Sequence, residues 1–212
     1  MTRTTERRVL RAAPACAAVL FLLFPISSSA AAAAQPDGHR FFMGVAAGYF
    51  RPLQASFRKI YDKPAWPLEL RLGWAAKPRL DLFAAVRFMR ADGNTVLLDA
   101  WEPGESYALR LRLLALRLGA SYYAGEGPIV PYLGAGIQYA SFKEEWLAIP
   151  LETSGSKAGF FVHGGGRLRL ARSLHLLAQL EYSHLPAGEG DRGQKVNLGG
   201  LCLSLGVRAG IF

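Results

Sequence analysis

The feature that most constrains the fold of this chain is the alternation of apolar with polar or small side chains along successive short segments. About half of the residues are hydrophobic (51%), yet no segment after the first 34 residues has an uninterrupted apolar run as long as a transmembrane helix, which needs roughly 20 residues. A period of two residues places neighbouring side chains on opposite faces of a β-strand. The sequence therefore predicts an all-β fold in which each strand has one apolar face.

Eight segments carry this alternation, and most are close to the roughly 9 to 11 residues that a tilted strand needs to cross a bilayer. In the fourth segment the apolar phase slips between Leu113 and Leu114, and we expect a β-bulge there because one extra residue reverses a period-two pattern. The expected strands lie near 41–49, 68–74, 80–88, 107–122, 129–139, 158–170, 174–183 and 201–211.

The connections between these segments alternate in length. Those after the second, fourth and sixth segments are tight, whereas those after the first, third, fifth and seventh are each longer than about 15 residues, a pattern that is typical of outer-membrane barrels. All six lysines fall in the expected loops or turns, among them Lys143 and Lys157 in the connection after the fifth segment. A soluble sheet would be expected to scatter its lysines along a wet face.

The N-terminus has the three parts of an export signal. Four arginines within the first eleven residues precede an apolar run over 12–26 and a tract of small residues that ends at Ala34. Cleavage after Ala34 fits the small-residue rule, so we predict a signal peptide over 1–34 and one barrel domain over 35–212. The formal net charge of the whole chain is +9. Because export argues against nucleic acid as a partner, this charge points to outer-membrane lipid and lipopolysaccharide.

Alternation alone does not say which face of the strands lies inside. The polar faces are rich in glycine, alanine and serine, which suits the narrow lumen of an eight-stranded barrel. The apolar faces carry aromatic residues near the strand ends, such as Trp74, Tyr122, Tyr139 and Tyr182, which suits the girdles at the two lipid boundaries. We therefore expect the apolar faces to contact lipid, with a soluble barrel that has an apolar interior as the alternative.

Two stretches carry a resemblance to a known family. The segment 130–136 (VPYLGAG) after a tight turn, together with 206–208 (GVR) and the terminal Phe212, resembles the outer-membrane β-barrel superfamily of OmpA-like, OmpX-like and OmpW-like proteins. The resemblance implies an eight-stranded antiparallel up-and-down transmembrane β-barrel, monomeric in the cell outer membrane, whose C-terminal strand is recognised by the barrel assembly machinery. In that family the terminal aromatic faces lipid, whereas here Ile211 holds the apolar phase and Phe212 lies one residue beyond it. The resemblance identifies no activity.

With the polar faces turned inward, the lumen receives more arginines than carboxylates. Unpaired buried charge is costly, so each carboxylate should be bridged by arginine, and the remaining arginines should be hydrated or bound to anions. Turn geometry places Arg169 opposite His175, His163 opposite Glu181, and Arg71 near Asp81; the last two are expected to be structural pairs. The predicted polar lumen network comprises Glu69, Arg71, Asp81, Arg87, Arg110, Arg112, Arg117, Gln138, His163, Arg167, Arg169, His175, Gln179, Glu181 and Arg208.

Three functional hypotheses follow from this sequence. The first is a non-enzymatic barrel with a structural or surface-binding role, which binds through loop residues of mixed charge and aromatic character (Phe57, Arg58, Tyr61, Phe142, Glu144 and Trp146). The second is a narrow pore for small apolar or anionic solutes, although eight strands leave no open channel unless side chains move aside. We expect no metal site and no cofactor, because the histidines lack metal-ligand spacing.

The third hypothesis is an outer-membrane hydrolase that resembles the lipid A deacylases, which are also eight-stranded barrels. His163, Glu181 and either Ser183 or His184 could form a His/Glu/Ser set on neighbouring strands. The His-x-Ser-Asn run of that family is matched best near His184, but Pro186 stands in the place of the nucleophilic serine. Without a nucleophile the acyl transfer has no first step.

Overall fold

The computed structural model describes residues 40–61, 63–96, 106–189 and 195–211. The predicted signal peptide and the out-of-phase Phe212 lie outside this part of the chain. Its elements are β1 (Phe41–Pro52), α1 (Ala55–Ile60), β2 (Leu68–Lys77), β3 (Leu80–Val96), β4 (Ser106–Tyr123), β5 (Ile129–Trp146), β6 (Glu152–Arg169), β7 (Leu174–His184), β8 (Pro186–Glu189), β9 (Lys195–Asn197) and β10 (Gly200–Gly210). None of the helices in the described residues is long and apolar enough to cross a membrane.

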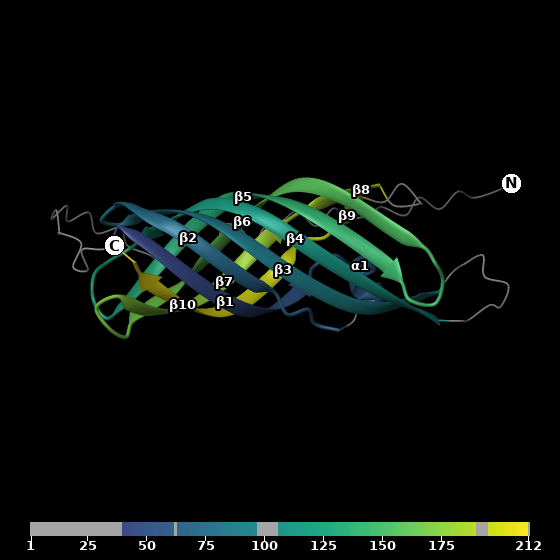
Figure 1. The fold of residues 1–212 in the computed structure, drawn as a ribbon, viewed down its shortest axis with the longest axis horizontal. Coiled ribbons are helices and arrows are strands. Elements are labelled where there is room, and N and C mark those ends of the chain that lie inside the picture. The colour runs from purple at the N-terminus through teal and green to yellow at the C-terminus, as the bar shows by residue number, and fades with distance from the viewer. Residues whose placement is uncertain (1–39, 62, 97–105, 190–194, 212) are drawn as a thin grey trace, which may run out of the picture. The chain divides into compact units, whose positions relative to one another are not determined.

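Eight of the strands form one closed antiparallel barrel in the order β1-β10-β7-β6-β5-β4-β3-β2 (Figure 1). The first and last of these strands pair along their length, from Phe42 opposite Gly210 to Pro52 opposite Gly200. This closure joins the first strand to the last, so that over the length the eight strands share no barrel edge is left open. The prediction of an eight-stranded up-and-down barrel is confirmed, and β8 and β9 form a separate two-stranded hairpin.

The inner and outer faces of the barrel wall exchange polarity along the length of the barrel. In the half that carries the tight turns, Leu70, Leu116 and Ile137 point outward with exposed fractions of 58–65%, while Glu69 and Arg117 are buried inside. In the half that contains α1, the inward side chains form a hydrophobic core instead. The predicted orientation, with the apolar faces outward, therefore describes only the half with the tight turns.

Two hairpins extend well beyond the predicted strand ends. Strand β3 continues to Val96, and β5 and β6 pair as far as Glu145 opposite Glu152. The prediction of a long connection after the fifth segment is therefore wrong, because the connection comprises only the residues between Trp146 and Glu152. Lys143 and Lys157, which were expected in that loop, lie within β5 and β6.

The predicted bulge near Leu113 and Leu114 is also wrong. Strand β4 pairs with both of its neighbours through this region without a register shift, as Leu113 opposite Met89 and Leu114 opposite Phe88 show. Leu113 stays inside the barrel and Leu114 stays outside. The apolar phase slips because the barrel interior becomes apolar at this level, and the strand itself continues regularly. The β2–β3 pair has a register shift between Ala75 and Lys77, beside a tight turn.

Candidate functional site

A buried ion network crosses the lumen in the half with the tight turns. The Glu69 carboxylate accepts hydrogen bonds from Arg71 (Nη2–Oε1, 2.6 Å), from Arg87 (Nε–Oε2, 3.0 Å) and from Arg117. The Glu181 carboxylate accepts two hydrogen bonds from Arg87, of 2.5 and 3.0 Å, and lies 2.7 Å from Arg117 Nη2. Two carboxylates thus hold three guanidinium groups in a dense cluster of paired charge.

Two of these arginines also stack on the faces of aromatic rings. The guanidinium carbon of Arg117, which is fully buried, lies 3.7 Å from the centroid of the Phe161 ring. That of Arg71 lies 4.2 Å from the Phe83 ring. A cation over an aromatic face is attracted by the electron-rich ring, most strongly where water is excluded. The rings therefore stabilise the charged arginines.

A second polar cluster lies closer to the tight turns. Arg208 of β10 pairs with Asp81 of β3 and donates a hydrogen bond of 2.8 Å to the Tyr123 hydroxyl. Its guanidinium carbon lies 3.6 Å from the Phe42 ring, and that of Arg167 lies 4.2 Å from the Tyr123 ring. This second cluster lies between the Glu69 and Glu181 network and the tight turns.

The predicted register of His163 and Glu181 is confirmed, but the predicted contact between their side chains does not form. The two residues lie directly opposite each other in β6 and β7. The His163 Nε2 atom is instead 3.0 Å from the Ser121 hydroxyl of β4, two strands away. Gly134 lies between them on β5, and a Cβ at that position would collide with His163 Nε2. The missing side chain of this glycine allows the serine and the histidine to meet.

The predicted Arg71–Asp81 pair does not form either. Arg71 binds Glu69, two residues away on the same strand, and Asp81 binds Arg208 from the far side of the lumen. In the β2–β3 ladder, Arg71 is opposite Ala85 rather than Asp81. Long side chains in a narrow lumen contact strands that are not neighbours, so cross-strand register does not fix their partners.

Arg110 and Arg112 are not in the lumen, which corrects their predicted placement. Both point outward from β4, where Arg110 Nε is 3.1 Å from Asp92 and Arg112 Nη2 is 3.5 Å from Glu145. They share the outer face with Leu114, because β4 has no bulge that would turn them inward. The strand is regular, so this face simply becomes charged farther along the barrel.

The other predicted lumen residues take up varied positions. His175 is buried and lies opposite both Arg169 and Arg208, but Arg169 is exposed at the end of β6. Gln138 is buried, and Gln179 donates a hydrogen bond of 3.2 Å to Glu181. These glutamines extend the polar layer between the charged groups.

Helix α1 folds into the far end of the barrel and closes it with apolar side chains. Phe57 and Tyr61 are buried with 6% and 3% of their surface exposed, and their rings are 4.6 Å apart. The Tyr61 hydroxyl donates a 2.5 Å hydrogen bond to Glu144 of β5. A helix of six residues is not stable alone, so packing holds it in place. The surrounding core comprises Phe50, Ala65, Met89, Ala91, Leu109, Leu111, Leu113, Ala115, Ala140, Leu185, Leu198 and Cys202.

We call α1 and the adjoining Tyr61 the α1 plug, and several of the loop residues predicted to contact an external partner lie in it or pack against its core. Phe57 and Tyr61 face the interior, and Phe142 and Trp146 pack against the same core. Arg58 remains exposed on the outer side of α1. The interior of the extended barrel buries Phe57 and Tyr61, so these two residues are not the external contacts that were predicted, whereas Phe142, Glu144 and Trp146 are only partly buried.

The possible hydrolase set is not assembled. The Ser183 hydroxyl is buried against the backbone of Gly200, at 3.4 Å from its carbonyl oxygen and 3.3 Å from its nitrogen. His184 lies on the opposite side of β7, 3.0 Å from Asn197. His163 is engaged with a different serine, and Glu181 is held by arginines. The geometry brings none of these groups together as nucleophile and base.

The hydrogen bond of Tyr61 gives the plug a defined response to alkaline pH. Burial, the hydrogen bond to Glu144 and its negative charge raise the pKa of Tyr61 far above its usual value of about 10. This stabilisation is fully present below pH 10 and is lost as the pH rises further. Tyrosinate absorbance should therefore show that folded wild-type protein and Tyr61→Phe titrate alike near pH 10. Urea-unfolded wild-type protein should show one more ionisation than the unfolded variant. An extra ionisation near pH 10 in the folded wild type would contradict a buried phenol.

No protein-family model matches the sequence, and no curated protein matches it. Among solved structures, Neisserial surface protein A is similar to this chain over 81% of its length and 97% of that protein, with 17% identity and a TM-score of 0.58. A major outer membrane protein from Thermus thermophilus is similar over 81% of this chain and 98% of that protein, with 15% identity and a TM-score of 0.53. This chain has the outer-membrane β-barrel fold. At these identities the likeness concerns the fold alone.

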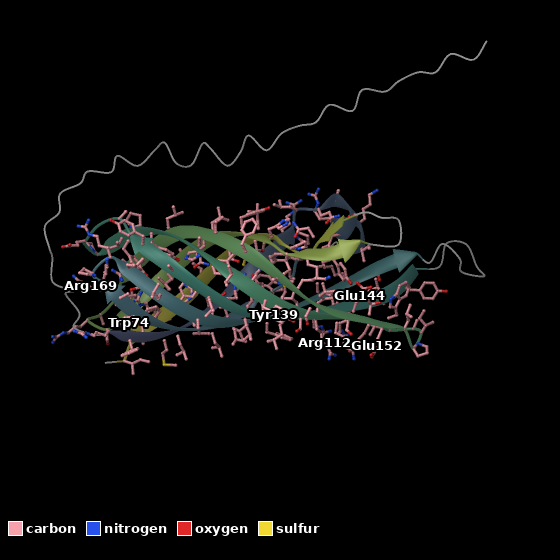
Figure 2. The ribbon with its side chains drawn as sticks, turned by 90° about the horizontal axis from the view of Figure 1, so that it is seen from above. Trp74, Arg112, Tyr139, Glu144, Glu152 and Arg169 are labelled. Carbon is pink, nitrogen blue, oxygen red and sulfur yellow. The ribbon has the colours of Figure 1, made fainter. Side chains whose placement is uncertain are left out.

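The outer-membrane β-barrel fold explains the exposed apolar side chains. In such barrels an outward apolar band contacts lipid, and aromatic residues mark its two boundaries. Figure 2 shows Trp74 near one end of the barrel and Tyr139 part-way along it, and both are largely exposed. Arg112 and Glu152 lie beyond Tyr139 in the same view. The lipid-facing band thus ends near Tyr139, and the barrel continues past it with a charged outer surface.

Proposed function

We propose that this protein is a non-enzymatic, monomeric barrel of the cell outer membrane, with a structural or surface-binding role and a lumen that does not conduct. The filled lumen is the observation that supports this proposal. The network around Glu69 and Glu181 occupies the membrane-embedded half, and the α1 plug occupies the other half. Within the described residues, a cavity of about 20 Å³ beside Glu69 and Arg71 has room for only about one water molecule.

Planar-bilayer recording tests this proposal. We expect the purified protein to give no reproducible unitary currents at any applied voltage of either sign, because ions would have to displace both the charge network and the plug. A large-pore porin in the same bilayers provides the positive control. Reproducible unitary currents from the wild-type barrel would instead favour the narrow pore for small apolar or anionic solutes.

A separate assay addresses the hydrolase alternative. Incubation of the purified barrel with lipopolysaccharide is expected to release no hydroxy fatty acid, because Ser183 is buried and its hydroxyl is engaged with the backbone of Gly200 rather than with His163 or His184. Release that disappears in a Ser183→Ala variant would overturn the proposed non-enzymatic role.

A further inference from the structure

Three cations lie side by side on the outer surface of the barrel. In the strand register, Arg90 of β3 is directly opposite Arg112 of β4, which is directly opposite Lys143 of β5. Adjacent strands are about 4.8 Å apart, so the three residues form a short row across the wall. We call Arg90, Arg112 and Lys143 the cationic row. Like charges placed directly opposite each other are destabilising, so such a row requires negative partners.

The carboxylates that pair with the cationic row all lie on the side away from the lipid band. Asp92 is 3.3 Å from Arg90, Glu145 is 3.5 Å from Arg112 and 3.2 Å from Lys143, and Glu152 is 2.9 Å from Lys143. Asp92 lies two residues beyond Arg90 in β3, and Glu145 lies two residues beyond Lys143 in β5. Glu152 of β6 is directly opposite Glu145. Among the residues that the structure describes, each cation therefore has its carboxylate partners on the side away from the lipid band.

The next outward positions toward the lipid band are uncharged. They are Phe88, Leu114, Ser141 and Ser156, which lie opposite one another across β3 to β6. Phe88 and Leu114 are 46% and 50% exposed. Two residues along a strand span about 7 Å, so the cationic row lies within that distance of the last apolar side chains. The headgroup region extends roughly 5–7 Å beyond the hydrocarbon core on each side of a bilayer, so this distance matches the depth of lipid headgroups.

We propose that the cationic row binds the phosphate groups of the glycolipid in the outer leaflet, the lipid A part of lipopolysaccharide. The exposed hydroxyls of Ser141 and Ser156, which are 2.9 Å apart, lie beside the row and provide further donors to phosphate oxygens. Charge-assisted hydrogen bonds to phosphate are strong, and basic residues near an anionic lipid surface are attracted to it. The inference rests on the proposed outer-membrane location and is independent of whether the lumen conducts.

Binding of lipid A to the purified barrel in nonionic detergent tests the proposal. The triple variant Arg90→Gln, Arg112→Gln, Lys143→Gln is compared with the wild type by native mass spectrometry of bound lipid A carrying both phosphates. Each cation near an anionic lipid contributes about fivefold in affinity, so the triple variant should bind roughly 100-fold more weakly. Lipid A without phosphates should bind both proteins equally, and inorganic phosphate at the same concentration should not displace the lipid.

The matched control removes three exposed cations from the opposite end of the barrel, in the variant Arg40→Gln, Lys77→Gln, Arg172→Gln. This control should retain wild-type affinity. Equal losses in both triple variants would overturn the proposal, because they would mean that only net charge matters. Unchanged affinity in the cationic-row variant would overturn it as well. Conductance of the wild type would refute the sealed lumen but would leave these binding results intact, so the two failures can be told apart.

Discussion

Replacement of Glu181 by alanine should destabilise the folded barrel by about 3–5 kcal/mol, the usual cost of removing one partner from a buried ion pair. Glu181 is 1% exposed and contacts both Arg87 and Arg117. Without it, Glu69 is left to compensate three guanidinium groups in a space from which water is largely excluded. The free energy of unfolding, measured by urea titration of the barrel in lipid vesicles with tryptophan fluorescence, gives the size of the effect.

Glu126 provides a matched control for this experiment. Its carboxylate is 3.6 Å from Arg79, but it is 53% exposed at a tight turn. An exposed pair of this kind contributes about 0–1 kcal/mol, so Glu126→Ala should change the unfolding free energy by no more than that. Equal, small effects of Glu181→Ala and Glu126→Ala would mean that the lumen charges are solvated, and the sealed-lumen proposal would then lose its support.

The membrane-embedded half of the barrel could be predicted from the sequence because its outer face is consistently apolar, whereas its inner face carries most of the charged and small side chains. Alternation such as that of Leu70 with Glu69 and Arg71 identifies both the strand and its inner face. The length of the β6–β7 turn sets the register that places His163 opposite Glu181. Both are local properties of one or two segments.

The partners of the lumen charges could not be predicted in the same way. Arg87 lies on β3 and Glu181 on β7, which are on opposite sides of the eight-stranded barrel. Their contact depends on barrel closure, on the length of the arginine side chain and on the space left by small neighbours. Register between adjacent strands carries none of this information.

The phase slip in β4 allowed two explanations, and strand length separates them. Leu109, Leu111 and Leu113 share the inner face with Arg117 in the regular strand. A bulge and an exchange of polarity between the faces give the same sequence pattern. The alternating segment over 107–122 is, however, longer than the roughly 11 residues that a strand needs to cross a bilayer. The excess length indicates a barrel that continues beyond the membrane, where an apolar interior and a polar exterior are expected.

Removal of the Phe57 ring of α1 and of the Tyr61 ring at its C-terminal end, in the variant Phe57→Ala, Tyr61→Ala, should release the helix from the end of the barrel. Truncation of a buried aromatic side chain typically costs about 3–5 kcal/mol, and Tyr61 also loses its hydrogen bond to Glu144. Helix α1 contains Arg58 and Lys59, so trypsin can report its release. Cleavage depends on local opening of the helix, and the rate should rise by roughly 100-fold or more.

Two further variants separate loss of the plug from loss of the fold. Leu53→Ala truncates an exposed side chain just before α1 and should leave the cleavage rate unchanged. Adding Arg58→Gln and Lys59→Gln to the double variant should abolish the new cleavage if it occurs in α1. A double variant that is as resistant as the wild type would show that the rings do not hold the helix.

The network around Glu69 and Glu181 is untouched by the double variant, so we expect no unitary currents from it even with α1 released. Currents that appear only in this variant would make the plug, rather than the ion network, the barrier in the lumen.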